Sequence, residues 1–107
     1  MNDTKTQEDE KMKLYYQPEG HWFGDCMPFG KGDTFYLFHQ RDTRVPCPFG
    51  EPFGWDLALT KDFVHYEDCG TAIPRGGDDE QDQFIYAGSI CEDREGRYHA
   101  FYTGYNR

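Results

Sequence analysis

The 107-residue chain has no long apolar run and few basic residues. No stretch approaches the roughly 20 apolar residues of a membrane span, and no apolar run follows Met1 as a signal peptide requires. With 11 Lys and Arg against 20 Asp and Glu, the net charge of −9 repels phosphate backbones and anionic lipid. We therefore expect a cytoplasmic protein that binds neither nucleic acid nor membranes.

The spacing of cysteine and histidine also lacks the patterns of metal sites. The chain has four cysteines, at Cys26, Cys47, Cys69 and Cys91. They form no C-x-x-C pair and, without a secretory signal, no disulfide framework. His39, His65 and His99 lie in separate aromatic segments without ligand spacing. The acidic run 78–82 lacks the periodic ligands of a calcium loop, so we expect reduced cysteines, no metal and no cofactor.

Aromatic residues, glycine and proline are abundant instead. Nine Phe, eight Tyr and two Trp accompany 12 Gly and six Pro, which is typical of a β-rich, turn-rich chain. The length allows one domain. Residues 1–13 carry seven charged side chains and no aromatic one, so we expect a charged, flexible tail there. The folded, all-β domain is expected at residues 14–107.

Short aromatic segments between clusters of Gly, Pro and Asp are typical of strands. We expect four strands at residues 24–29, 34–41, 55–60 and 64–68, and two more at 84–91 and 98–105. Residues 55–69 also allow a helix, because Leu59, Phe63 and Tyr66 would share one helix face. We favour two strands there, joined by a turn at Lys61 and Asp62.

A weak internal repeat indicates how these strands are organised. A shift of 63 residues places the segment 33–39 on 96–102 and Arg44 on Arg107. Repeats of about 50 to 65 residues that consist of short strands are typical of the four-stranded blades of a β-propeller. The sequence therefore predicts about one and a half antiparallel blades.

Few residues stand out as candidates for chemistry. Asp25 lies in the segment 21–29 among large apolar residues, where exclusion of water would sharpen the electrostatics of a catalytic carboxylate. The alternative is an Asp that caps a turn after Gly24. Trp55 is either a sugar-stacking residue or a buried aromatic. Residues 41–44 are either a sugar-contacting pair or a solvated strand end with a local ion pair.

Several patches, in order along the chain, resemble one known family. Residues 22–25 (WFGD) resemble a Trp-x-Asn-Asp motif, with Gly24 in place of Asn, and residues 38–40 (FHQ) resemble an aromatic-x-Gln strand. Residues 55–66 resemble Trp-Gly-His-Ala-x-Ser-x-Asp-Leu-Val-His-Trp, residues 86–89 resemble Phe-Ser-Gly-Ser, and residues 101–104 resemble a Tyr-Thr-Gly strand. These are patterns of glycoside hydrolase family 32, the β-fructosidases, whose fold is a five-bladed β-propeller.

The resemblance implies roles for individual residues. Asp25 would be the nucleophile of a retaining hydrolase that cleaves β-fructofuranosyl bonds in sucrose, inulin or levan. Trp22, Gln40 and Trp55 would contact the sugar, and Tyr86 with Ser89 would form part of the pocket wall.

The resemblance also implies what this chain lacks. The family's second carboxylate, in Arg-Asp-Pro, and its acid/base, in Glu-Cys, have no counterpart here, because Asp42 and Glu92 do not match those motifs. We therefore expect a chain that carries the nucleophile without the acid/base, and that associates with itself or with the missing blades.

Two alternatives to this interpretation remain open. One is a non-catalytic carbohydrate-binding or structural fragment. The other is a related furanosidase with an inverting mechanism, in which Asp25 would be a general base.

Overall fold

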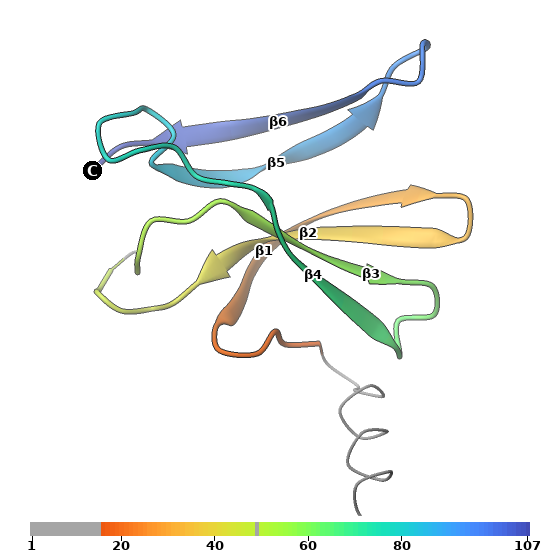
Figure 1. Cartoon of the computed structure of the whole chain (residues 1–107), viewed down its shortest axis with the longest axis horizontal. Coiled ribbons are helices and arrows are strands. Elements are labelled where there is room, and N and C mark those ends of the chain that lie inside the picture. The colour runs from red at the N-terminus through yellow and green to blue at the C-terminus, as the bar shows by residue number, and fades with distance from the viewer. Residues whose placement is uncertain (1–15, 49) are drawn as a thin grey trace, which may run out of the picture.

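The computed structural model describes residues 16–48 and 50–107, which form strands and connecting loops (Figure 1). The strands are β1 (Trp22–Lys31), β2 (Thr34–Asp42), β3 (Trp55–Thr60), β4 (Tyr66–Ile73), β5 (Phe84–Glu92) and β6 (Tyr98–Tyr105). The all-β prediction is confirmed. Within the described ranges no helix is long and apolar enough to cross a membrane. The tail expected at residues 1–13 lies outside the described residues.

Strands β1 to β4 form one antiparallel sheet in sequence order, as expected for a propeller blade. The β1–β2 hairpin pairs Lys31 with Thr34 at its tight turn and Trp22 with Asp42 at its open end. Strand β3 continues the sheet, with Trp55 opposite Gln40. The four-stranded unit predicted from the sequence is therefore present.

Strand β4 differs from the prediction of a strand at 64–68. It begins at Tyr66 and continues through Gly70 to Ile73, five residues beyond the expected end. Its register against β3 slips between Asp56 and Ala58. Gly70 has a φ of +74°, which glycine adopts without strain. An irregularity of this kind bends the strand rather than ending it.

Strands β5 and β6 form a second, two-stranded antiparallel sheet. Their connection is a five-residue loop in which Asp93 accepts hydrogen bonds from the backbone N–H groups of Glu95 and Arg97, both at 2.9 Å. Within the described ranges no strand pairs with the outer edge of β6. This arrangement matches the expected first half of a second blade.

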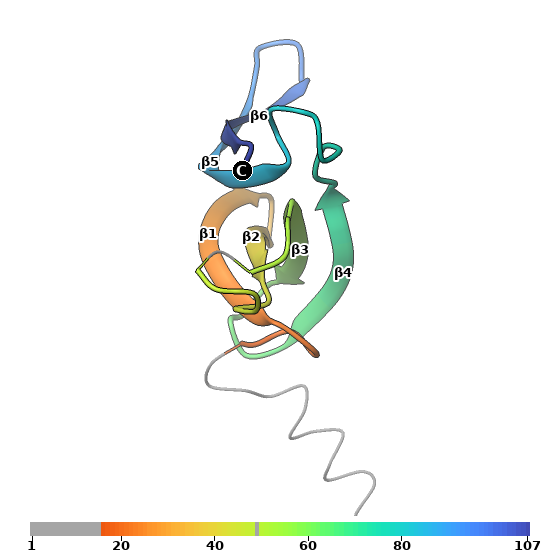
Figure 2. The ribbon, with the colours of Figure 1, turned by 90° about the vertical axis from the view of Figure 1, so that its left-hand side faces the viewer.

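The two sheets pack against each other with β1 next to β5 (Figure 2). Met27, Trp55 and Ile85 form the buried core between them. The indole Nε1 of Trp55 donates a hydrogen bond to the carbonyl oxygen of Tyr86 at 2.9 Å. At the far end, the Nζ of Lys31 lies 3.1 Å from both carboxylate oxygens of Glu92. Hydrophobic packing and hydrogen bonds therefore both join the sheets.

Both sheets carry a β-bulge at equivalent positions. In β1, Gly24 and Asp25 together lie opposite Gln40, because the register slips between Phe23 and Cys26. In β5, Tyr86 and Ala87 together lie opposite Thr103, because the register slips between Ile85 and Gly88. Thr103 follows Gln40 by the 63-residue offset of the sequence repeat. The sequence repeat therefore corresponds to a repeated structural unit, and that unit includes the bulge.

Candidate active site

One end of the molecule collects most of the residues singled out in the sequence. The open end of the β1–β2 hairpin, the start of β3 and the start of β5 lie together, since Gln40 pairs with Trp55 and the N–H of Ile85 donates to the carbonyl of Phe53 at 2.9 Å. Asp25, Gln40, Trp55 and Tyr86 therefore come from four strands to the same end of the two sheets.

Asp25 occupies the bulge of β1 and is exposed. Its apolar sequence neighbours do not surround it, because Met27 points into the core between the sheets while the side chains of Cys26 and Pro28 alternate to the other face. The expectation of a water-excluded carboxylate is thus not met in this chain. A bulge redirects side chains and is frequent beside active sites, so this position still suits a reacting group.

Gln40 lies directly opposite the bulge and is buried, with 8% of its surface exposed. Its Nε2 has no hydrogen-bond partner among the described residues. Leaving a buried donor unsatisfied costs about 1–3 kcal/mol. A ligand that offers a hydrogen-bond acceptor to this Nε2 would therefore be bound more favourably.

Trp55 and Tyr86 are packed side chains. Trp55 has no exposed surface, so in this structure its ring does not present a face to a sugar. Of the two interpretations from the sequence, its burial fits the buried aromatic. Tyr86 is half-buried, and its ring meets those of Phe53 and Tyr105 at centroid distances of 5.4 and 5.9 Å. Burial raises the pKa of its hydroxyl above the ordinary value.

Trp22 and Ser89 are the two remaining predicted site residues. The Trp22 ring is 40% exposed and is covered on one side by the guanidinium of Arg44, 3.7 Å from the ring centroid. Ser89 is exposed, and because Ile90 packs on the first sheet, the alternation of the strand places Ser89 on the opposite face. No contact in the described ranges links either residue to Asp25.

The sequence interpretation missed the role of Arg44. For residues 41–44 the sequence offers a sugar-contacting pair or a solvated strand end with a local ion pair, and neither includes a contact with Trp22. Instead Asp42 accepts the backbone N–H of Arg44 at 2.8 Å, and Arg44 turns back over Trp22 with a φ of 64°. A guanidinium stacked on an indole is a cation–π contact, which no local sequence pattern revealed.

A second polar cluster lies on the other face of the first sheet. Asp56 is buried and accepts a hydrogen bond from the Thr71 hydroxyl at 3.0 Å. The Nε2 of His21 lies 3.3 Å from Asp56 Oδ2 without hydrogen-bond geometry. His39 is fully buried against the Phe23 ring, and burial lowers its pKa. Within the described residues, no group of three His, Cys, Asp or Glu side chains is placed to hold a metal ion.

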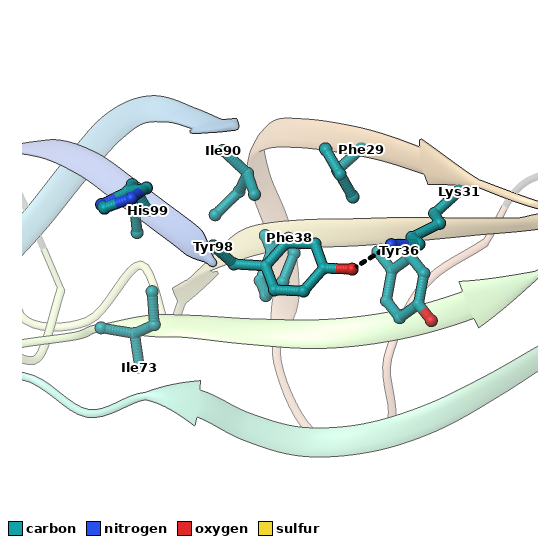
Figure 3. Close-up of a pocket in the computed structure, with 9 residues that line it drawn as sticks. Phe29, Lys31, Tyr36, Phe38, Ile73, Ile90, Tyr98 and His99 are labelled. Atoms are coloured by element: carbon teal, nitrogen blue, oxygen red, sulfur yellow. Dashed lines mark hydrogen bonds between the residues drawn. The ribbon is translucent and has the colours of Figure 1, made fainter. Parts of the chain in front are cut away.

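An apolar hollow lies between the two sheets, lined by none of the bulge residues (Figure 3). It has a volume of about 340 Å³ and lies between the sheets at the end that carries Lys31 and Tyr98. Phe29, Phe38 and Ile90 form its apolar wall, and Lys31 donates a hydrogen bond to the Tyr98 hydroxyl at its rim. It contains none of the proposed site residues, so we assign it to the packing of the sheets.

Comparison with known proteins supplies one match. The sequence model described as the glycosyl hydrolases family 32 N-terminal domain matches residues 15–107. A search of curated proteins gave no match. The matched range contains the bulge, both sheets and every candidate site residue named above.

Proposed function

Because the chain belongs to glycoside hydrolase family 32, we propose that it binds β-fructofuranosyl groups, as in sucrose, inulin or levan, with Asp25 as the nucleophile. One observation carries the proposal. Asp25 is exposed in a bulge of β1, directly opposite a buried Gln40 whose Nε2 has no hydrogen-bond partner in the described ranges. A carboxylate and an unsatisfied donor on neighbouring strands suit a sugar with several hydroxyl groups.

In the proposed reaction, a carboxylate oxygen of Asp25 attacks the anomeric carbon of the fructosyl group. The bond from that carbon to the leaving oxygen breaks, and its electron pair goes to the leaving oxygen, which takes a proton from a general acid. Water then attacks the same carbon of the fructosyl ester, gives a proton to the same group acting as a base, and releases Asp25 with free fructose.

Gln40 is the proposed hydrogen-bond partner of a sugar hydroxyl. Its Nε2 is buried, so we expect binding to turn the amide group outward. Trp22, Tyr86 and Ser89 remain proposed sugar contacts. Trp55 is omitted from that set because its side chain is fully buried, and we assign it to holding the sheets together.

Neither Glu92 nor Asp42 is placed to act as a partner acid for Asp25. Retaining hydrolysis needs two carboxyl groups about 5–5.5 Å apart. Glu92 is bound to Lys31, six residues along β1 from Asp25, which corresponds to about 20 Å of strand. Asp42 is engaged by the backbone N–H of Arg44. We therefore propose that the acid/base comes from further blades or from another chain.

A second candidate function is carbohydrate binding without turnover. It is favoured by the positions of Glu92 and Asp42, neither of which is placed to act as the acid beside Asp25. In that case the bulge would still bind a fructoside, but Asp25 would form no bond to it. The test is therefore designed to measure binding and turnover separately.

The experiment titrates the purified chain with sucrose, inulin and levan oligosaccharides, with NMR detection of binding and enzymatic detection of free fructose. We expect shifts of the Asp25 and Gln40 signals and little or no fructose, because loss of an acid/base residue typically costs about 10²–10⁴ in rate. Gln40→Ala should weaken binding, whereas Gln81→Ala, at an exposed loop glutamine, should not. Signals that no fructoside shifts would refute the proposal, and rapid fructose release would show that a carboxylate of this chain serves as the acid.

A further inference from the structure

Gly24 of β1 lies close against Gln40 of β2. A Cβ added there would lie 2.8 Å from the Cβ of Gln40, 3.1 Å from its carbonyl oxygen and 3.2 Å from its Oε1. The first two of these atoms belong to the backbone or are bonded to it, so they cannot rotate away as the end of a long side chain would. Any side chain at position 24 must therefore separate the two strands locally.

Gln40 has little freedom to retreat from such a side chain. Its other neighbour in the sheet is Trp55, which is fully buried and hydrogen-bonded to the carbonyl of Tyr86. Closely packed interiors resist displacement. The strain would therefore be relieved by movement of β1, which carries Asp25 as the next residue in the same bulge.

We propose that Gly24 is a positioning residue: the absence of a side chain lets β1 lie against Gln40 and so fixes the place of Asp25. The proposal rests on the proposed function for the role of Asp25. The motif that residues 22–25 resemble has Asn where this chain has Gly24. An error of about 1 Å in the place of a reacting group can cost about 10²-fold in rate.

The test compares Gly24→Ala with Gly30→Ala. Gly30 lies in the same strand, and a Cβ there would meet only the Phe35 ring at 3.5 Å, an ordinary contact. Neither glycine has a positive φ, so the backbone at both positions is compatible with alanine. The first readout needs no sugar: NMR of the wild-type chain should show contacts between the Gly24 α-protons and the Gln40 β-protons. The backbone signals of Asp25 and Gln40 should shift in Gly24→Ala and not in Gly30→Ala.

The second readout is the rate of covalent labelling by β-D-fructofuranosyl fluoride. Its fluoride leaves without a proton, so the step needs a nucleophile but no acid: the carboxylate oxygen bonds to the anomeric carbon as the carbon–fluorine bond breaks. We expect Gly24→Ala to lower the labelling rate constant at saturation at least tenfold with an unchanged half-saturating concentration. Gly30→Ala should stay within about twofold of wild type.

The two readouts separate this inference from the proposed function. Absence of the Gly24–Gln40 contacts, or a Gly24→Ala variant whose Asp25 signal and labelling rate are unchanged, would overturn the positioning role. If wild type, Gly30→Ala and Gly24→Ala all remain unlabelled, the nucleophile assignment fails, and the NMR shifts alone decide whether Gly24 positions Asp25. Should Gly24→Ala fail to fold, the wild-type proton contacts decide.

Discussion

Asp62 organises the turn between β3 and β4. Its Oδ1 accepts the backbone N–H groups of Val64 and His65 at 2.9 and 2.8 Å, and its Oδ2 lies 2.8 Å from Nδ1 of His65. Thr60 closes the turn by donating its hydroxyl to the His65 carbonyl at 2.8 Å. Asp62 and His65, in the segment 55–66 that carries part of the family resemblance, therefore have a structural role.

Asp62→Ala should lower the thermal midpoint by several degrees, because two backbone N–H groups lose their acceptor. The matched control is Asp79→Ala, at an exposed aspartate in the β4–β5 loop, which should leave the midpoint nearly unchanged. Circular dichroism during heating measures both. Equal midpoints for the two variants would contradict the role assigned to Asp62.

Stability should also fall in acid. The hydrogen bonds from His65 and Val64 hold the pKa of Asp62 well below its usual range, and the His99 and Arg97 groups around Asp93 lower its pKa to about 2. A carboxyl whose pKa is lower in the folded state stabilises the fold above its unfolded pKa of roughly 4, and this contribution is lost as the pH falls toward the folded value. The midpoint of wild type should therefore drop between about pH 4 and pH 2, and less steeply in an Asp62→Ala, Asp93→Ala double variant. Parallel curves would contradict this explanation.

Among the elements, the contact between the two sheets depends most on Trp55. Its ring is fully buried between Met27 and Ile85, and its indole nitrogen is bonded across to Tyr86. A small domain buries only about 60% of its unfolded surface, so a single aromatic of this size carries much of the stability. The second sheet has only two strands, and such a ribbon is marginally stable alone.

Trp55→Phe should cost about 1–3 kcal/mol of unfolding free energy, through loss of the hydrogen bond and part of the packing. Trp22→Phe should cost less than about 0.5 kcal/mol, because that ring is 40% exposed and its replacement still offers a face to Arg44. Urea unfolding followed by circular dichroism gives both values. A larger loss for Trp22→Phe would show that the sheets are held together elsewhere.

The strands that the sequence predicted correctly are those whose residue types and bounding turns are visible in a short segment. Residues 34–41 and 84–91 are rich in aromatic and other apolar residues and are bounded by turns, so their strands were correctly placed. The continuation of β4 through Gly70 was not predictable, because glycine is common both in loops and in irregular strands. The burial of Trp55 and the pairing of Asp56 with His21 depend on contacts between distant residues, which a local pattern does not contain. The bulge at Asp25 was missed for the same reason: it appears only when β1 is aligned with β2.

At the scale of the whole molecule, the second sheet has an edge that is available to another strand. The outer edge of β6 along residues 98–104 has no paired strand within the described ranges. An unprotected edge with exposed aromatics such as Phe101, at 59% exposure, invites pairing with another chain. We therefore expect self-association, or association with further blades.

Phe101→Lys should reduce self-association, since a charge on an edge strand opposes pairing. Val45→Lys is the control, because Val45 is 70% exposed in a loop away from that edge. Light scattering at micromolar concentrations should show a smaller mean mass for Phe101→Lys only. A wild-type chain that remains monomeric with a sharp unfolding transition would contradict the expectation.

The most direct test of the proposed function identifies the residue that β-D-fructofuranosyl fluoride labels. Without a nearby acid/base to activate water, the fructosyl ester should accumulate, and digestion followed by mass spectrometry should place one fructosyl group on Asp25. Asp25→Asn should fold with a thermal midpoint close to that of wild type and remain unlabelled. A label on another residue, equal labelling of Asp25→Asn, or no label on wild type would contradict the assignment of Asp25 as the nucleophile.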